Sequence, residues 1–234
     1  MIKKIDMLGI QLDNYTVREA IMQVESYLSN NMLNTIESIS MRMLIESESD
    51  PVVKDVISSL DLAVIGEKEI IQASGDATMQ RVKETEANDF AFEFFKRVER
   101  NKKSVFLLGD TEEKIADACQ ELLEEYPKLI IDGEYAVENC VGDLDAVINE
   151  LNATTPDIIV SILPTPMQEH FFMEHKDKMN ASIWYGMGEL GLGGKKHSIG
   201  SFFKSMMHRG RLKNSIDKYD KGASEEQEQS ENEL

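Results

Sequence analysis

Ser104-Val105-Phe106-Leu107-Leu108-Gly109-Asp110-Thr111 is the stretch of sequence that decides the fold. Its apolar run is typical of a strand that is buried on both faces, and Gly109 to Thr111 form the turn that follows. Residues 112–125 then carry apolar side chains at helical spacing, and either Asp110 or Thr111 can cap this helix. A strand, a turn and a helix in this order are the building unit of a parallel α/β sheet.

The same alternation of short apolar runs and amphipathic segments recurs on both sides of this unit. We therefore predict an α/β fold, namely a Rossmann-like parallel sheet with helices on both faces, in a single domain with a short C-terminal helical appendage. The first hundred residues are less regular than the rest. Expected strands cover 33–39, 62–65, 105–108, 129–131, 157–162 and 181–185, and expected helices cover 16–29, 51–59, 88–100, 112–125, 144–151 and 166–178.

The chain is strongly acidic, with 43 acidic and 25 basic side chains and a formal net charge of −18. This balance opposes nucleic-acid binding, because phosphate backbones are recognised by clustered cations. The two cysteines, Cys119 and Cys140, match neither a disulfide framework nor a metal-ligand spacing, which fits a reducing compartment. Since no apolar run is long enough for a membrane span or a signal peptide, we predict a cytoplasmic protein.

Ligands of open α/β sheets bind beyond the carboxyl ends of the strands, so the loops at those ends are the places to search. None of these loops is a Walker loop or a complete GxGxxG motif, and we predict no cofactor. His170 and His175 are five residues apart, which turns them about 140° from each other on a helix. They therefore do not share a face, and we predict no metal site.

Several short motifs follow one another along the chain. They are Ser104 to Gly109, Tyr126-Pro127, Pro156-Asp157-Ile158, Pro166-Met167-Gln168-Glu169 and Gly186-Met187-Gly188, with Asp50-Pro51 and Asp61 to Ile65 upstream. Their order resembles that of the WecG/TagA/CpsF glycosyltransferases. The resemblance spans about residues 5 to 215, and the PxQE element is its most specific match. It implies a transferase that moves N-acetylmannosamine or a related hexose from a UDP-sugar to a polyprenyl-diphosphate-linked sugar, in cell-wall or capsule synthesis.

This sequence departs from the family pattern at three places. The family's Thr-x-Asn is here Ser38-Ile39-Ser40, which keeps a hydroxyl and loses the amide. The family's Pro-Asp-Gly, whose Asp is a candidate general base, is here Ile65-Gly66-Glu67. The Asp of a third motif, Gly-Gly-x-Phe-Asp, is also missing, because the chain reads Gly188-Glu189-Leu190-Gly191-Leu192 there.

Three interpretations of these departures stay open. In the first, Glu67 supplies the base from one position later. In the second, the site binds a UDP-sugar without turnover and the protein serves an active partner. In the third, the donor or the acceptor has changed. If the protein is an active hexosyltransferase, we predict Glu67 and Ser38 as catalytic residues. Losing a general base forfeits about 10²- to 10⁴-fold in rate, so the second interpretation describes a pseudoenzyme.

The predicted substrate-binding residues follow from the same resemblance. Arg81 matches a family arginine suited to a diphosphate, although a solvated arginine is the alternative. Gln168 and Glu169 match the PxQE element, against the alternative of ordinary first-turn residues. Gly109 would let a nucleotide approach the backbone, although a plain turn also explains it. The full predicted set is Ser40, Arg81, Gly109, Gln168, Glu169 and Gly188.

The C-terminal part divides into a basic segment and an acidic tail. Apolar side chains at helical spacing and several cations predict an amphipathic basic helix over 199–220, after an α/β domain over 1–198 and before a disordered acidic tail over 221–234. Residues 199–213 either contact the inner face of the plasma membrane peripherally or pack on their own domain. A homo-oligomer or a paralogous partner is a further expectation.

Overall fold

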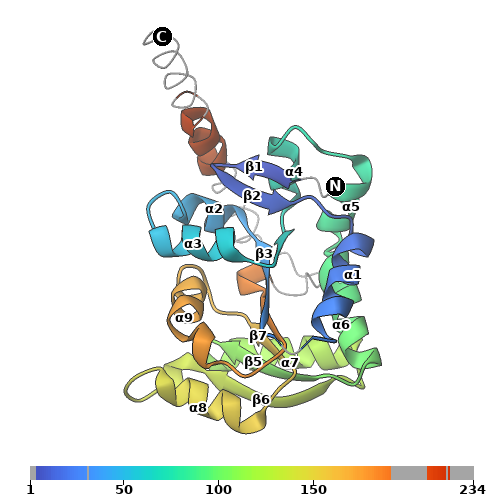
Figure 1. The fold of residues 1–234 in the computed structure, drawn as a ribbon, viewed down its shortest axis with the longest axis vertical. Coiled ribbons are helices and arrows are strands. Elements are labelled where there is room, and N and C mark those ends of the chain that lie inside the picture. Colours follow the sequence, from blue (N-terminus) through green and yellow to red (C-terminus); the bar gives the residue numbers. More distant parts are fainter. Residues whose placement is uncertain (1–3, 31, 191–209, 220, 222–234) are drawn as a thin grey trace.

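The computed structural model describes residues 4–30, 32–190, 210–219 and 221. Eight strands of the described residues form one sheet in the order β1-β2-β4-β3-β8-β7-β5-β6, and Figure 1 shows β1 and β2 far from β5 and β6. The strands are β1 (Lys4–Met7), β2 (Ile10–Asp13), β3 (Asn34–Ile39), β4 (Leu62–Ile65), β5 (Ser104–Gly109), β6 (Ile130–Ala136), β7 (Ile158–Ser161) and β8 (Ile183–Gly186). All neighbouring pairs are parallel except β1 and β2.

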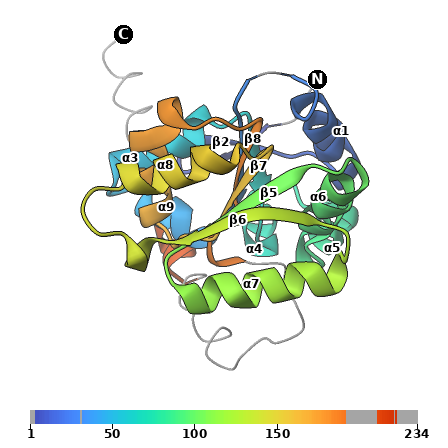
Figure 2. The same ribbon diagram turned by 90° about the horizontal axis from the view of Figure 1, so that it is seen from below.

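The α-helices connect these strands across the two faces of the sheet. They are α1 (Val17–Tyr27), α2 (Met41–Glu46), α3 (Pro51–Ser59), α4 (Lys68–Ala73), α5 (Met79–Glu86), α6 (Asp89–Arg100), α7 (Glu112–Glu125), α8 (Asp145–Thr154) and α9 (Met167–His175). The short 3-10 turns in the described part of the chain are η1 (Val137–Asn139), η2 (Lys176–Lys178) and η3 (Gly188–Leu190). Figure 2 shows α3, α8 and α9 on one face and α6 and α7 on the other. The predicted Rossmann-like α/β class is confirmed.

Local chemistry explains where the helices begin. Thr16 and Glu19 form a capping box at the start of α1, and Thr111 accepts the backbone N–H of Lys114 at the start of α7. Asp50 caps α3, which has Pro51 in its first turn. These signals are local, so the sequence places α3 and α7 at their observed bounds.

The N-terminal hairpin and three helices were not predicted. β1 and β2 pair antiparallel around a two-residue turn in which Leu8 and Gly9 both have positive φ, at 57° and 77°. α2, α4 and α5 are six to eight residues long, too short for a clear helical period. The sheet is therefore mostly parallel, with an antiparallel strand at one edge.

Buried apolar side chains pack on both faces of the sheet. One cluster joins α1, α6 and α7 to the sheet around Phe94 and Tyr185. A second joins α3, α8 and α9 around Trp184, and a third surrounds the β1–β2 hairpin. None of the described helices is long and apolar enough to cross a membrane.

Residues 210–219 form a helix that lies beside β1, drawn in red in Figure 1. Leu212 is buried in the cluster around the hairpin, and Ser215 donates a hydrogen bond to Glu48 at 2.5 Å. Arg211 and Lys213 are exposed. This part of the appendage packs on its own domain, whereas residues 199–209 of the predicted basic helix lie outside the described residues.

Candidate functional site

The carboxyl ends of β3 and β4 lie side by side and carry two of the predicted loops. Ser38 pairs with Val64 and Ile39 with Ile65, and the backbone N–H of Gly66 donates to the Ile39 carbonyl at 2.9 Å. A Cβ on Gly66 would lie 2.4 Å from Leu190 and 3.1 Å from the Ile39 carbonyl oxygen. The close packing here therefore favours glycine at position 66, one residue before Glu67.

Ser38 is held by a neighbouring strand. Its hydroxyl lies 3.0 Å from the hydroxyl of Tyr185 on β8, and both side chains are buried. Burial raises the pKa of Tyr185 well above its usual range, so the phenol stays protonated and can donate to Ser38. Tyr185 was not singled out in the sequence, where it reads as part of a buried strand.

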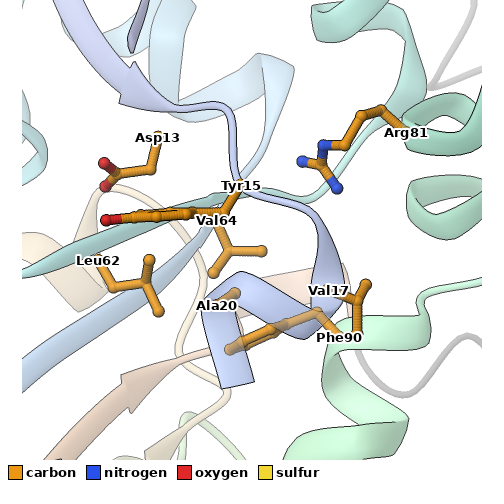
Figure 3. A pocket seen from close by; sticks show the side chains of 8 residues that line it. All are labelled: Asp13, Tyr15, Val17, Ala20, Leu62, Val64, Arg81 and Phe90. Carbon is orange, nitrogen blue, oxygen red and sulfur yellow. The ribbon is translucent and has the colours of Figure 1, made fainter. Parts of the chain in front are cut away.

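Ser38 and Arg81 line the same hollow. Val17, Gly66 and Phe90 complete much of its wall, and it has room for about one water molecule. Figure 3 shows the adjoining hollow, where Arg81 reaches toward the segment that carries Tyr15 and Asp13 lies on the far side of that segment. The fold thus brings together a predicted catalytic hydroxyl and the predicted diphosphate-binding arginine.

Arg81 is only 7% exposed and already has partners. Its Nε donates to Asn14 at 3.3 Å, and one terminal nitrogen pairs with Glu84 at 3.2 Å. The alternative of a solvated arginine is therefore wrong.

Glu67 stands between the starts of two helices. It occupies the N-cap position of α4 without capping it, and its carboxylate accepts the backbone N–H of Met41 at the start of α2. Burial is the main reason that its pKa rises to about 7, from a usual value of 4.5. A carboxyl with this pKa at the carboxyl edge of the sheet has the acidity of a general base that works near neutral pH.

We expect this raised pKa to lower the free energy of unfolding as pH rises from about 4.5 to about 7. The folded protein holds the Glu67 proton up to about pH 7 and the unfolded chain only to about 4.5, so stability is lost as pH rises through this window. Glu67→Gln keeps an acceptor for Met41 without the charge. The variant should match the native protein at pH 4 and exceed it at pH 8 by up to about 3 kcal/mol in urea unfolding. An equal gain at both values would contradict the raised pKa.

Gln168 and Glu169 lie on α9, and both are almost fully buried, with 1% and 0% exposure. Thr165 donates a hydrogen bond to Glu169 at 2.9 Å. The Gln168 side chain hydrogen-bonds Glu37 on β3, a buried acid that was not predicted as a site residue. Its signal in the sequence was an acidic residue inside a strand that is buried on both faces.

The two predicted glycines and Ser40 have structural roles in their loops. Gly109 ends β5, where a Cβ would lie 2.7 Å from the Ile115 side chain. Gly188 has a positive φ of 56° at the start of η3. Ser40 caps α2 by accepting the Met43 N–H at 3.2 Å. These roles explain the residue types without a ligand, so substrate binding by these three stays a prediction.

Gly109 also lies at a topological switch point, where the direction in which successive strands are added to the sheet reverses. After β5 the chain passes to α7 on one face, and after the neighbouring β7 it passes to α9 on the other. Ligands of open α/β sheets occupy such points.

No group of three or more His, Cys, Asp and Glu side chains is placed to hold a metal within the described part of the chain. His170 contacts Asp50 at 2.7 Å, while His175 is buried against Phe171.

Comparison with known proteins decides the family. The model of the glycosyl transferase WecG/TagA/CpsF family matches residues 5–190, which is most of the chain. The chain belongs to this family. Similar proteins include the N-acetylglucosaminyldiphosphoundecaprenol N-acetyl-beta-D-mannosaminyltransferases of Staphylococcus aureus strains NCTC 8325 / PS 47 and COL. Both are 24% identical over 208 residues, covering 83% of this chain and 78% of theirs.

The range of the WecG/TagA/CpsF match locates the predicted site within the family's common part. Every predicted catalytic and substrate-binding residue lies inside 5–190, from Ser38 to Gly188. The helix over 210–219 lies beyond it. The predicted resemblance reached residue 215, so the family match ends earlier than expected.

Proposed function

We propose that this protein transfers N-acetylmannosamine or a related hexose from its UDP-sugar to a polyprenyl-diphosphate-linked N-acetylglucosamine. The family is one of glycosyl transferases, and the similar Staphylococcus aureus proteins are named for this type of reaction. The single observation that carries an active enzyme is the place of Glu67, whose carboxyl stands at the carboxyl edge of the sheet and accepts the Met41 N–H.

In the proposed reaction the acceptor hydroxyl attacks C1 of the donor sugar. A new C1–O bond forms, the bond from C1 to UDP breaks, and UDP leaves with the bonding electrons. Glu67 takes the proton of the attacking hydroxyl, which requires its ionised form and an approach of about 3 Å. Ser38 positions the sugar or acceptor hydroxyl, oriented by its contact with Tyr185.

The other predicted residues bind the donor in this proposal. Arg81 meets the diphosphate, since guanidinium groups pair well with phosphate oxygens. Gln168 and Glu169 recognise hydroxyl or base groups, while Ser40, Gly109 and Gly188 line the loops around the donor.

We place residues 1–198 in the α/β domain, 199–220 in the basic helix and 221–234 in the acidic tail. Because the proposed acceptor is linked to a membrane lipid, we further propose that the protein is cytoplasmic and contacts the inner face of the plasma membrane through residues 199–213.

The second candidate function is a binding protein without turnover that serves an active glycosyltransferase as a paralogous or identical partner. The replaced motifs favour it: Ser40 stands where the family pattern has an Asn, and Gly66 stands where that pattern has the Asp of its candidate base. The deciding experiment measures UDP release from UDP-N-acetylmannosamine and UDP-N-acetylglucosamine, with a soluble polyprenyl-diphosphate-GlcNAc analogue. Turnover supports the enzyme, whereas UDP binding without turnover supports the partner.

Arg81→Ala should weaken UDP binding by about 10- to 100-fold, because a charge-assisted contact with phosphate contributes roughly 1.5–3 kcal/mol. Isothermal titration with UDP checks this. Arg100→Ala is the control, since this exposed arginine ends α6 away from the hollow. Equal UDP affinity in the native protein and Arg81→Ala would remove Arg81 from the donor site.

A further inference from the structure

The loop between β2 and α1 meets α5 beside the hollow that Ser38 and Arg81 line. Asn14 lies in this loop, directly after Asp13 ends β2. Its Oδ1 accepts the Nε–H of Arg81 at 3.3 Å, across 67 residues of sequence. Figure 3 shows the Arg81 side chain reaching from α5 toward this segment. The guanidinium is therefore held by a residue outside its own helix.

Glu84 holds Arg81 from within α5. Its Oε2 accepts a hydrogen bond from Nη1 of Arg81 at 3.2 Å and another from the backbone N–H of Val17, the first residue of α1, at 3.1 Å. Gln80 donates to the other oxygen, Oε1, at 2.8 Å. A carboxylate at the start of α1 is also favourable, since the N-terminus of a helix is partly positive. Three donors thus fix the carboxylate that fixes Arg81.

These contacts are compatible with a ligand on the same guanidinium. Arginine presents five N–H groups in one plane, and neither contact involves the second terminal nitrogen, Nη2. Both contacts can therefore persist while Nη2 donates to a phosphate oxygen. Arg81 and Glu84 line the hollow that Ser38 also lines, so the held guanidinium stands at the candidate site.

Ordering Arg81 before a ligand arrives lowers the cost of binding. A free arginine side chain samples many rotamers and loses that freedom when it pairs with a phosphate. Asn14 and Glu84 order the side chain during folding, so this loss is not repeated on binding. They also set the plane of the guanidinium, on which its contact with a phosphate depends.

We propose that Asn14 and Glu84 are positioning residues, which hold the Arg81 guanidinium in one orientation so that it meets the diphosphate of the donor. Their role rests on the proposed function, which assigns the diphosphate to Arg81. In a purely structural role, the same contacts would only fasten α5 to the start of α1. The two roles differ in whether the effect of Asn14 or Glu84 on UDP binding depends on the presence of Arg81.

Isothermal titration with UDP compares the native protein with Glu84→Ala, Glu84→Gln and Asn14→Ala. We expect the two alanine variants to bind UDP about 3- to 10-fold more weakly, because ordering Arg81 then occurs at the expense of affinity. Glu84→Gln keeps a side-chain oxygen for Arg81 and should restore at least about half of the native affinity. Glu93→Ala is the matched control, since it removes an ion pair of the same i,i+3 spacing on α6, with Lys96 at 2.9 Å, and should bind UDP as the native protein does.

A double-mutant cycle separates positioning from a structural role. Adding Asn14→Ala or Glu84→Ala to Arg81→Ala should weaken UDP binding by a further factor of less than about 2, because the positioned group is already absent. An undiminished loss in the Arg81→Ala background would overturn positioning. If melting curves show that Glu84→Ala does not fold, Asn14→Ala carries the cycle alone.

The native protein distinguishes a failure of positioning from a failure of the proposed function. A native protein that binds no UDP would refute the proposed function and the positioning role together. Native binding of UDP that neither alanine variant weakens would overturn the positioning role alone.

Discussion

Glu67→Gln should abolish transfer while leaving UDP binding almost unchanged. The amide keeps the acceptor for the Met41 N–H but cannot take a proton from the acceptor hydroxyl. Loss of a general base lowers rates by about 10²- to 10⁴-fold. UDP release under saturating donor and acceptor measures this loss, and isothermal titration should give a UDP affinity within about 2-fold of native.

The pH profile of the native enzyme provides an independent check on Glu67. Because the ionised carboxylate is the base and its pKa is about 7, the rate should rise with pH below 7 and level off above it. Glu121→Gln on the exposed surface of α7 is the matched control and should behave as native. Full activity in Glu67→Gln would exclude Glu67 as the base, and a native protein that binds UDP without turnover would favour the partner function.

Phe94→Ala should be the most destabilising of the substitutions considered. The ring of Phe94 is fully buried on α6 and lies 4.6 Å from that of Tyr185 and 5.3 Å from that of Phe95, centre to centre. Removing a buried phenylalanine ring leaves a cavity and costs about 3–5 kcal/mol. Urea unfolding should show this loss, and the melting midpoint should drop by roughly 10 °C.

The control for Phe94 is Leu123→Ala on α7. Leu123 is 44% exposed, so its truncation should lower the free energy of unfolding by about 0.5 kcal/mol or less, far below the loss expected for Phe94→Ala. A loss below about 1 kcal/mol for Phe94→Ala would show that α6 is not packed on β8 as described. The same variant should reduce activity in the surviving folded protein, because Phe94 packs against the tyrosine that contacts Ser38.

The candidate site was predictable where a loop follows a recognisable strand. Ser38 lies near the carboxyl end of β3, and the loops after β4 and β8 carry Glu67 and Gly188, so each stands at the expected carboxyl end of its strand. The environment of each side chain was not predictable, because Arg81 meets Asn14 and Gln168 meets Glu37 across long separations in sequence. The sequence therefore indicates where to search for the site, and the packing decides what each group can do there.

The sequence by itself determined the α/β class and the bounds of several elements. Apolar runs, helical periodicity and capping residues such as Thr111 and Asp50 act over a few neighbours, so they can be read along the chain. The order of the strands depends on which apolar faces pack together, and the pKa of Glu37 is raised by its burial and by the charge of Glu169 on α9. Only the tertiary structure decided these, because burial and charge pairing are set by residues that are distant in sequence and adjacent in space.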